Sequence, residues 1–155
     1  MTGFFAYPEP HPTGVRANER EHSPFLHDCD RRSWAALRRH SHIEGIAAGR
    51  PVIRRGDTER SLVVLLDGEL VVPGRRDRWE PARYEPGEVL GELTFFDGRP
   101  QPETVVAARD SHVLRIRQEN FDVLAAHEPA LARQLLMDLG RAMATRLRAA
   151  GRQRS

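Results

Sequence analysis

Between residues 42 and 117 the chain consists of short apolar runs separated by glycine-containing breaks, and this punctuation limits the fold more than any other feature. Short runs rich in Val, Ile and Leu and bounded by turns are typical of β-strands. Their regular recurrence favours an antiparallel, sandwich-like roll. We predict eight strands, at residues 43–47, 51–55, 62–66, 70–72, 79–84, 89–90, 104–108 and 112–117. The Asp67-Gly68 dipeptide between two of them predicts a tight hairpin turn.

Helical patterns flank this region on both sides. Asp30 fits the N-cap position of a first helix, and Trp34, Ala36 and Leu37 form its inward stripe. Helical spacing returns at residues 119–124 and continues from Pro129, a residue tolerated in a first helical turn, to about residue 150. We therefore predict a mostly β fold, an eight-stranded antiparallel, jelly-roll-like β-roll with an N-terminal helix and C-terminal helices.

Length and composition restrict the organisation of the chain. The 155 residues suit one domain. Residues 1–22 are proline-rich and mostly polar, which predicts a flexible tail, followed by a domain at 23–150 and a short tail at 151–155. Within the domain we expect the β-roll at about 42–117 and the C-terminal helices at about 118–150.

Charge and cysteine content restrict the partners and the compartment that we expect for the protein. All 24 basic residues are arginines, but 22 acidic residues reduce the formal net charge to +2, which gives no nucleic-acid footprint. Cys29 is the only cysteine, so an intrachain disulfide is impossible and a cytoplasmic location is expected. No apolar run approaches the ~20 residues that span a bilayer, so we expect no membrane association.

The most informative segment is residues 91–107, which read GELTFFDGRPQPETVVA. It resembles the phosphate-binding cassette of cyclic-nucleotide-binding domains, the effector-domain fold of the catabolite activator protein, whose pattern is roughly Gly-Glu-Leu-Ala, five residues, then Pro-Arg-(Ala/Ser)-Ala-Thr. Three other segments resemble family turns in the same order, namely AGRPVIRRGD at 48–57, LDGELVV at 66–72 and YEPGEVLGE at 84–92. The resemblance covers about residues 24–150.

The resemblance places a candidate nucleotide site at Gly91, Glu92, Leu93, Gln101, Pro102, Glu103 and Thr104. In the family, the residue at the Glu92 position accepts a hydrogen bond from the ribose 2′-hydroxyl. The alternative for Glu92 is that it caps the short cassette turn or pairs with an arginine. Backbone contacts are implied for Gly91 and Leu93, and a base or phosphate contact for Thr104, although the turn and the strand would also accept these residues for steric reasons alone.

The cassette departs from the family at its anion-binding positions. The phosphate-binding arginine is replaced by Gln101, and a charged hydrogen bond of this kind is worth roughly 1.5–3 kcal/mol. Pro102 removes a backbone N–H, and Glu103 adds a negative charge near the phosphate position. We therefore expect binding of cyclic AMP or cyclic GMP to be weak or lost.

The last helix has a second possible role. Its apolar side chains recur every fourth residue, at Leu131, Leu135, Leu139, Met143 and Leu147. The family uses this helix for dimerisation and for closing over the nucleotide, so the stripe predicts either a homodimer or simple packing against the roll. The sequence ends at Ser155, after this helix and without a helix-turn-helix, so we expect no direct DNA binding. Any regulatory output would go through an unidentified protein partner or through a longer polypeptide of which this chain is a piece.

A metal-dependent enzyme is the remaining alternative. His40, His42 and Glu44 suggest the His-x-His plus carboxylate of cupins, which are also β-rolls, but the further histidine that a cupin would need is missing. No catalytic constellation appears, so we predict neither a catalytic residue nor a cofactor. Three functions remain. Two stand level, a non-enzymatic regulatory sensor of a cyclic nucleotide or related small molecule and a homodimerisation or partner-docking module without ligand, and a cupin-like enzyme comes after them.

Overall fold

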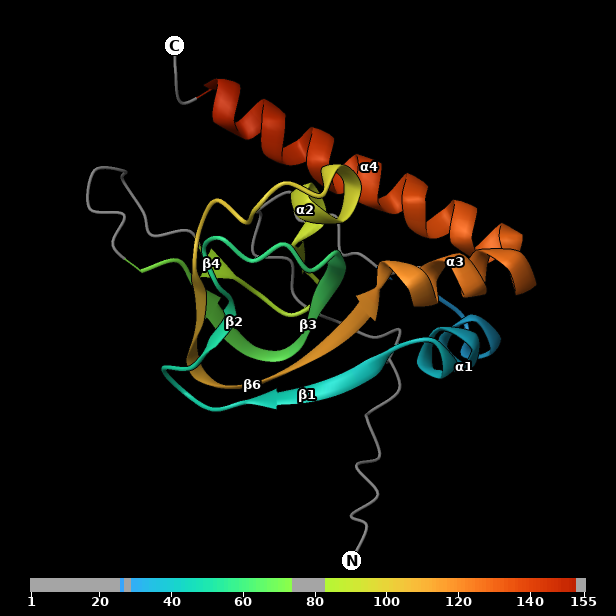
Figure 1. Cartoon of the computed structure of the whole chain (residues 1–155), viewed down its shortest axis with the longest axis horizontal. Coiled ribbons are helices and arrows are strands. Elements are labelled where there is room, and N and C mark those ends of the chain that lie inside the picture. The colour runs from blue at the N-terminus through green and yellow to red at the C-terminus, as the bar shows by residue number, and fades with distance from the viewer. Residues whose placement is uncertain (1–25, 27–28, 74–82, 153–155) are drawn as a thin grey trace, which may run out of the picture.

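A computed structural model describes residues 26, 29–73 and 83–152. In chain order the elements are α1 (Arg31–Arg39), β1 (His42–Ile46), β2 (Pro51–Ile53), β3 (Ser61–Val71), β4 (Arg83–Tyr84), β5 (Val89–Leu90), α2 (Glu92–Asp97), β6 (Val105–Arg117), α3 (Gln118–His127) and α4 (Pro129–Arg152). Figure 1 shows the strands as a curved layer, with α4 running along one side of it past α2. The tail predicted at 1–22 lies outside the described residues. At the other end, α4 extends to Arg152, past the predicted end of the C-terminal helices at about residue 150.

The two longest strands, β3 and β6, organise the sheet. They pair antiparallel from Ser61 opposite Arg117 to Val71 opposite Val106. The six-stranded sheet has the order β1-β6-β3-β4, with β2 also paired to β6 and β5 to β3. All of these pairings are antiparallel, as the sequence predicted.

The predicted number of eight strands is wrong, because the described residues form six. The breaks expected near 67–68 and 108–111 do not end strands; each is a β-bulge inside β3 or β6. The register shifts around Asp67 and Glu69, and the Ser111 hydroxyl bridges the irregularity by accepting from Glu69 N at 3.1 Å and donating to Arg109 O at 2.7 Å. Since the side chain replaces lost ladder bonds, pairing continues where the glycine suggested a hairpin.

The first helix forms as its sequence predicted. The Asp30 carboxylate accepts a hydrogen bond from Ser33 N at 2.7 Å, which confirms Asp30 as the N-cap. Ala36 and Leu37 are buried and Trp34 is partly buried against the core. The start of α4 at Pro129 is also confirmed.

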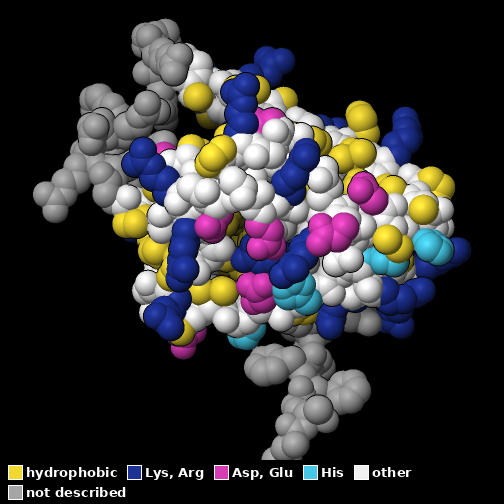
Figure 2. Space-filling view, viewed as in Figure 1, with side chains coloured by type: hydrophobic (Ala, Val, Ile, Leu, Met, Phe, Trp, Pro, Cys, Tyr) yellow, Lys and Arg dark blue, Asp and Glu magenta, His cyan; other side chains and the backbone are white. Residues whose placement is uncertain are grey.

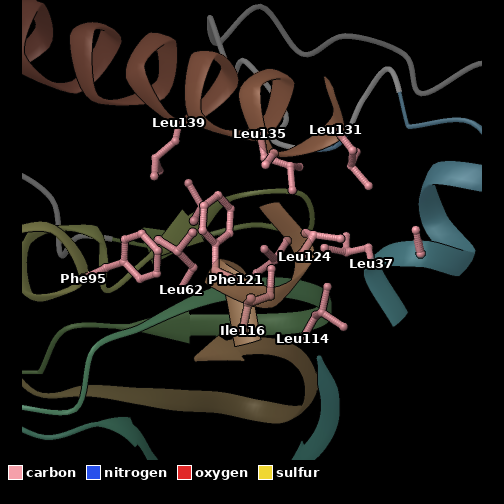
Figure 3. Packing of buried hydrophobic residues seen from close by; sticks show 14 of the residues in the cluster. Leu37, Leu62, Phe95, Leu114, Ile116, Phe121, Leu124, Leu131, Leu135 and Leu139 are labelled. Atoms are coloured by element: carbon pink, nitrogen blue, oxygen red, sulfur yellow. The ribbon is translucent and has the colours of Figure 1, made fainter. Parts of the chain in front are cut away.

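Alternate residues of β3 supply two separate apolar clusters, because successive side chains of a strand point to opposite faces. Leu62 and Val64 belong to the cluster that also contains residues of the helices. Val63 and Leu65 belong to a second cluster, which is made of residues in or next to the strands. Figure 3 shows Leu131, Leu135 and Leu139 of α4 pointing toward the side chains of α3 and the sheet. The four-residue spacing of these leucines therefore serves packing within the chain.

None of the helices in the described ranges is long and apolar enough to cross a membrane.

Candidate functional site

The cassette predicted from the sequence forms a sharp turn followed by a short helix. Strand β5 ends at Leu90, Gly91 has a φ of +82°, and α2 follows directly. A Cβ atom on Gly91 would lie 2.8 Å from the carbonyl oxygen of Ser61, a distance that side chains do not tolerate. The turn therefore needs glycine both for its left-handed backbone and for its close approach to β3.

Polar contacts hold α2 in place from both sides. The buried Thr94 hydroxyl donates to Arg99 O at 2.7 Å, which closes the loop after the helix. Arg60 donates from Nε to Phe95 O at 3.0 Å and from Nη2 to Phe96 O at 2.7 Å. Arg60 thus caps carbonyl groups at the end of α2, a role that the sequence analysis missed because nothing near residue 60 marks it.

Aromatic packing anchors the same helix to the core. Phe95 is buried and meets the ring of Phe121 edge-on, with 5.6 Å between centroids. Its neighbours Leu93 and Phe96 are about half exposed, at 50% and 46%. The structure therefore places Leu93 at the surface of the cassette.

Gln101, which stands at the family's arginine position, is buried, with 8% of its surface exposed. Its backbone is fixed by two bonds, N to Asp57 O at 2.8 Å and O from Gly56 N at 2.9 Å. Its side-chain Nε2 lies 3.7 Å from the point where a Cβ on Gly91 would sit, so the amide faces the start of α2. Among the described residues, this amide takes part in no hydrogen bond.

The three residues after Gln101 have different surroundings. Pro102 is exposed, and Glu103 is partly buried. The Thr104 hydroxyl accepts a hydrogen bond from Arg55 N at 3.0 Å, and this bond ties the start of β6 to the end of β2. Thr104 thus has a structural partner of its own.

Glu92 pairs with an arginine from the last helix, which is one of the two alternatives that the sequence left for it. Arg146 of α4 donates from Nη1 to Glu92 Oε1 at 2.9 Å. Its Nη2 donates to Val89 O, and its guanidinium carbon lies 5.6 Å from the centre of the Tyr84 ring. The Glu92 side chain is only 13% exposed in this arrangement.

Tyr84 is a site residue that the sequence analysis missed. Burial raises the pKa of its hydroxyl above the ordinary value, and the nearby charge of Arg146 opposes this rise. Three carboxylates close to the ring raise the pKa further, those of Glu92, Glu103 and Glu88. The candidate site is therefore acidic around one aromatic ring, with Arg146 as a compensating charge.

Of the two histidines of the metal hypothesis, only His42 contacts Glu44. His42 Nε2 lies 2.6 Å from Glu44 Oε1, and the same carboxylate accepts from Arg115 Nε at 2.9 Å. The His40 ring stacks on His127 at 6.3 Å. Within the described ranges, no group of three or more His, Cys, Asp or Glu side chains is arranged to hold a metal ion.

The predicted dimerisation stripe divides into two parts. Leu131, Leu135 and Leu139 are buried in the chain's own core, Met143 is partly buried, and Leu147 is 72% exposed. Two further large apolar side chains of α4, Leu136 and Met137, are exposed. A dimer through α4 stays a prediction and would have to use these exposed side chains. Figure 2 shows arginines and acidic side chains interspersed on the face seen there, with apolar side chains scattered among them.

Comparison with known proteins places this geometry in context. The sequence profile described as the cyclic nucleotide-binding domain matches residues 44–128, a range that includes the whole cassette. Lysophospholipase NTE1 of Chaetomium globosum is 27% identical over 107 residues. That match covers 67% of this chain but only 7% of the lysophospholipase.

Two solved structures show the same fold. The N-terminal domain of a transcriptional regulator from Streptomyces coelicolor A3(2) is 26% identical, with a TM-score of 0.62, and the match covers 85% of this chain and 92% of that domain. The catabolite activator protein of Thermus thermophilus is 24% identical, with a TM-score of 0.66, and the match covers 84% of this chain and 61% of that protein.

Proposed function

Because the chain belongs to the cyclic nucleotide-binding domain family, we propose that it is a non-enzymatic sensor module that binds cyclic nucleotides weakly and responds through α4. The observation that carries this proposal is Gln101, a buried amide that faces the cassette glycine from the family's arginine position. A glutamine amide can both donate and accept hydrogen bonds, so at this position it can bind a polar atom of a ligand.

The charges around the site support weak rather than tight binding of a cyclic phosphate. A neutral amide in place of a guanidinium removes roughly 1.5–3 kcal/mol of charge-assisted hydrogen bonding, which is about one to two decades of affinity. Glu92, Glu103 and Glu88 all lie close enough to Tyr84 to act on its pKa, so carboxylates gather on this side of the site. Their repulsion of a phosphate adds to the loss.

Calorimetric titration with cyclic AMP and cyclic GMP tests the proposal. The wild type should bind weakly, in the high micromolar to millimolar range, and Gln101→Arg combined with Pro102→Ser and Glu103→Ala should bind at least tenfold more tightly. Gln134→Arg, on the first half of α4, adds the same charge as Gln101→Arg but away from the cassette, and should leave the affinity unchanged. Failure of the triple variant to bind either nucleotide would reject the proposal.

A second candidate function is homodimerisation or partner docking without a ligand. The observation that favours it is the group of exposed apolar side chains on α4, Leu136, Met137 and Leu147. Sedimentation velocity over a hundredfold concentration range would test it, since a monomer at all concentrations leaves docking to another protein as the only form of this function. The single cysteine makes a reducing compartment such as the cytoplasm part of either proposal.

A further inference from the structure

The contacts of Arg146 have the composition of a complete guanidinium-binding site. A carboxylate from α2 accepts one of its N–H groups, the Val89 carbonyl of β5 accepts another, and the Tyr84 ring of β4 faces its cation. Carboxylate, carbonyl and aromatic face are the three partners that a guanidinium prefers in proteins. The carboxylate comes from the cassette itself and the other two from the strands that precede it, whereas the guanidinium comes from the last helix.

The position of Arg146 along α4 gives this contact a structural role, because it lies beyond the buried part of the helix. The apolar anchoring of the helix ends near Ala142, which is buried, and Met143, which is partly buried. From Leu147 to Arg152 every residue is exposed. The contacts of Arg146 tie α4 to the sheet side of the molecule at a point beyond the last buried residue of the helix, Ala142.

We propose that the Glu92 side of the candidate site is a guanidinium-binding site whose resident ligand is Arg146 of α4. The side chain acts as an intramolecular ligand that latches the end of α4 onto the cassette. A small molecule that needs the Glu92 carboxylate gains it only by displacing Arg146, and displacement frees the last turns of the helix. This consequence for ligands rests on the proposed sensor function, whereas the site and its occupant do not.

Hydrogen exchange of the full chain without any ligand tests the latch. Arg146→Gln should speed the exchange of backbone amides at 147–151 about tenfold, because it removes the contacts that hold this part of the helix to the cassette, and weakly held segments open more readily. Arg148→Gln removes the same charge two residues away, from an exposed side chain, and should leave this exchange unchanged. Glu92→Gln should reproduce the effect of Arg146→Gln, and the double variant should add nothing further. Equal exchange in the Arg146→Gln and Arg148→Gln proteins would overturn the latch.

Methylguanidine, added as a probe, tests the ligand class. Arg146→Ala leaves the carboxylate, the carbonyl and the ring without their cation, so millimolar methylguanidine should cause saturable NMR shifts at residues 84 and 89–92. The same titration of the wild type and of the Glu92→Gln, Arg146→Ala double variant should give no saturable shift. Saturation that persists in the double variant, or none in Arg146→Ala, would overturn the assignment. Neither experiment uses a nucleotide, so a failure here is distinguishable from a failure of the sensor function.

Discussion

Replacing Gly91 with alanine tests whether the cassette turn depends on its closeness to β3. Two costs are expected. The first is the left-handed backbone, φ +82°, which costs an alanine about 1 kcal/mol. The second is the contact of 2.8 Å between the new Cβ and the Ser61 carbonyl oxygen, which the flanking backbone must relieve. Overpacking of this kind typically costs about 1–3 kcal/mol, so Gly91→Ala should lower the free energy of unfolding by about 2–4 kcal/mol.

Gly49 provides a matched control within the same chain. Its φ is +81°, nearly the same as that of Gly91, but a Cβ there would have no atom within 4 Å. Gly49→Ala should therefore cost only the backbone part, about 1 kcal/mol. Urea denaturation followed by circular dichroism separates the two, since both variants should shift the midpoint at an unchanged slope. Equal losses in the two variants would refute the reasoning, because the contact with β3 would then cost nothing.

Three further predictions concern the core, the pH response and the thiol. Leu139→Ala should lower the free energy of unfolding by about 2–5 kcal/mol because Leu139 is fully buried. Leu147→Ala, at an exposed position, should change that free energy by less than about 0.5 kcal/mol. A loss of stability in Leu147→Ala that depends on protein concentration would mean that a second copy of the chain covers this residue. Burial alone would raise the pKa of the Glu44 carboxyl, but Arg115 and His42 outweigh it and hold that pKa below the ordinary 4.5. Stability from Glu44 is thus present above about pH 4.5 and is lost as the pH falls through the lowered pKa, so the stability difference between wild type and Glu44→Gln should shrink in urea titrations below about pH 4. Burial raises the pKa of the Cys29 thiol from 9.0 to about 11, with Asp30 and Asp138 contributing. Iodoacetamide at pH 8 should therefore alkylate the folded protein about a hundredfold more slowly than the urea-unfolded chain, as measured by intact mass. Similar alkylation rates in the two states would contradict a raised thiol pKa.

Local signals in the sequence predicted a large part of this structure. The Asp30 cap and the Pro129 start act on the nearest helical turn, so both were readable without knowledge of the fold. The cassette glycine could also be placed, because the pattern around it has fixed spacing. The hairpin predicted at Asp67-Gly68 was wrong because a bulge and a turn use the same residues, and the choice depends on Ser111, far along the chain.

The part of the candidate site that sequence reasoning missed is the part assembled from distant segments. Arginines are abundant in this chain, so no local pattern identified Arg146 as the partner of Glu92 or Arg60 as the cap of α2. Tyr84 was read only as part of a family turn, and its burial became visible only with the carboxylates and α4 around it. The position and turn of the cassette were predictable, whereas the long-range partners of its side chains were not.

The pairing of β3 with β6 also determines when the candidate site can form. The cassette lies in the connection between these two strands, whose register joins Val71 to Val106 and Ser61 to Arg117. When β3 and β6 pair, the chain between them is closed into a long loop. The entropy lost in closing this loop is offset only after the strand contacts have formed, so strand pairing is slow. The site should therefore mature late during refolding, after the helices, so that the appearance of its geometry reports completion of the sheet.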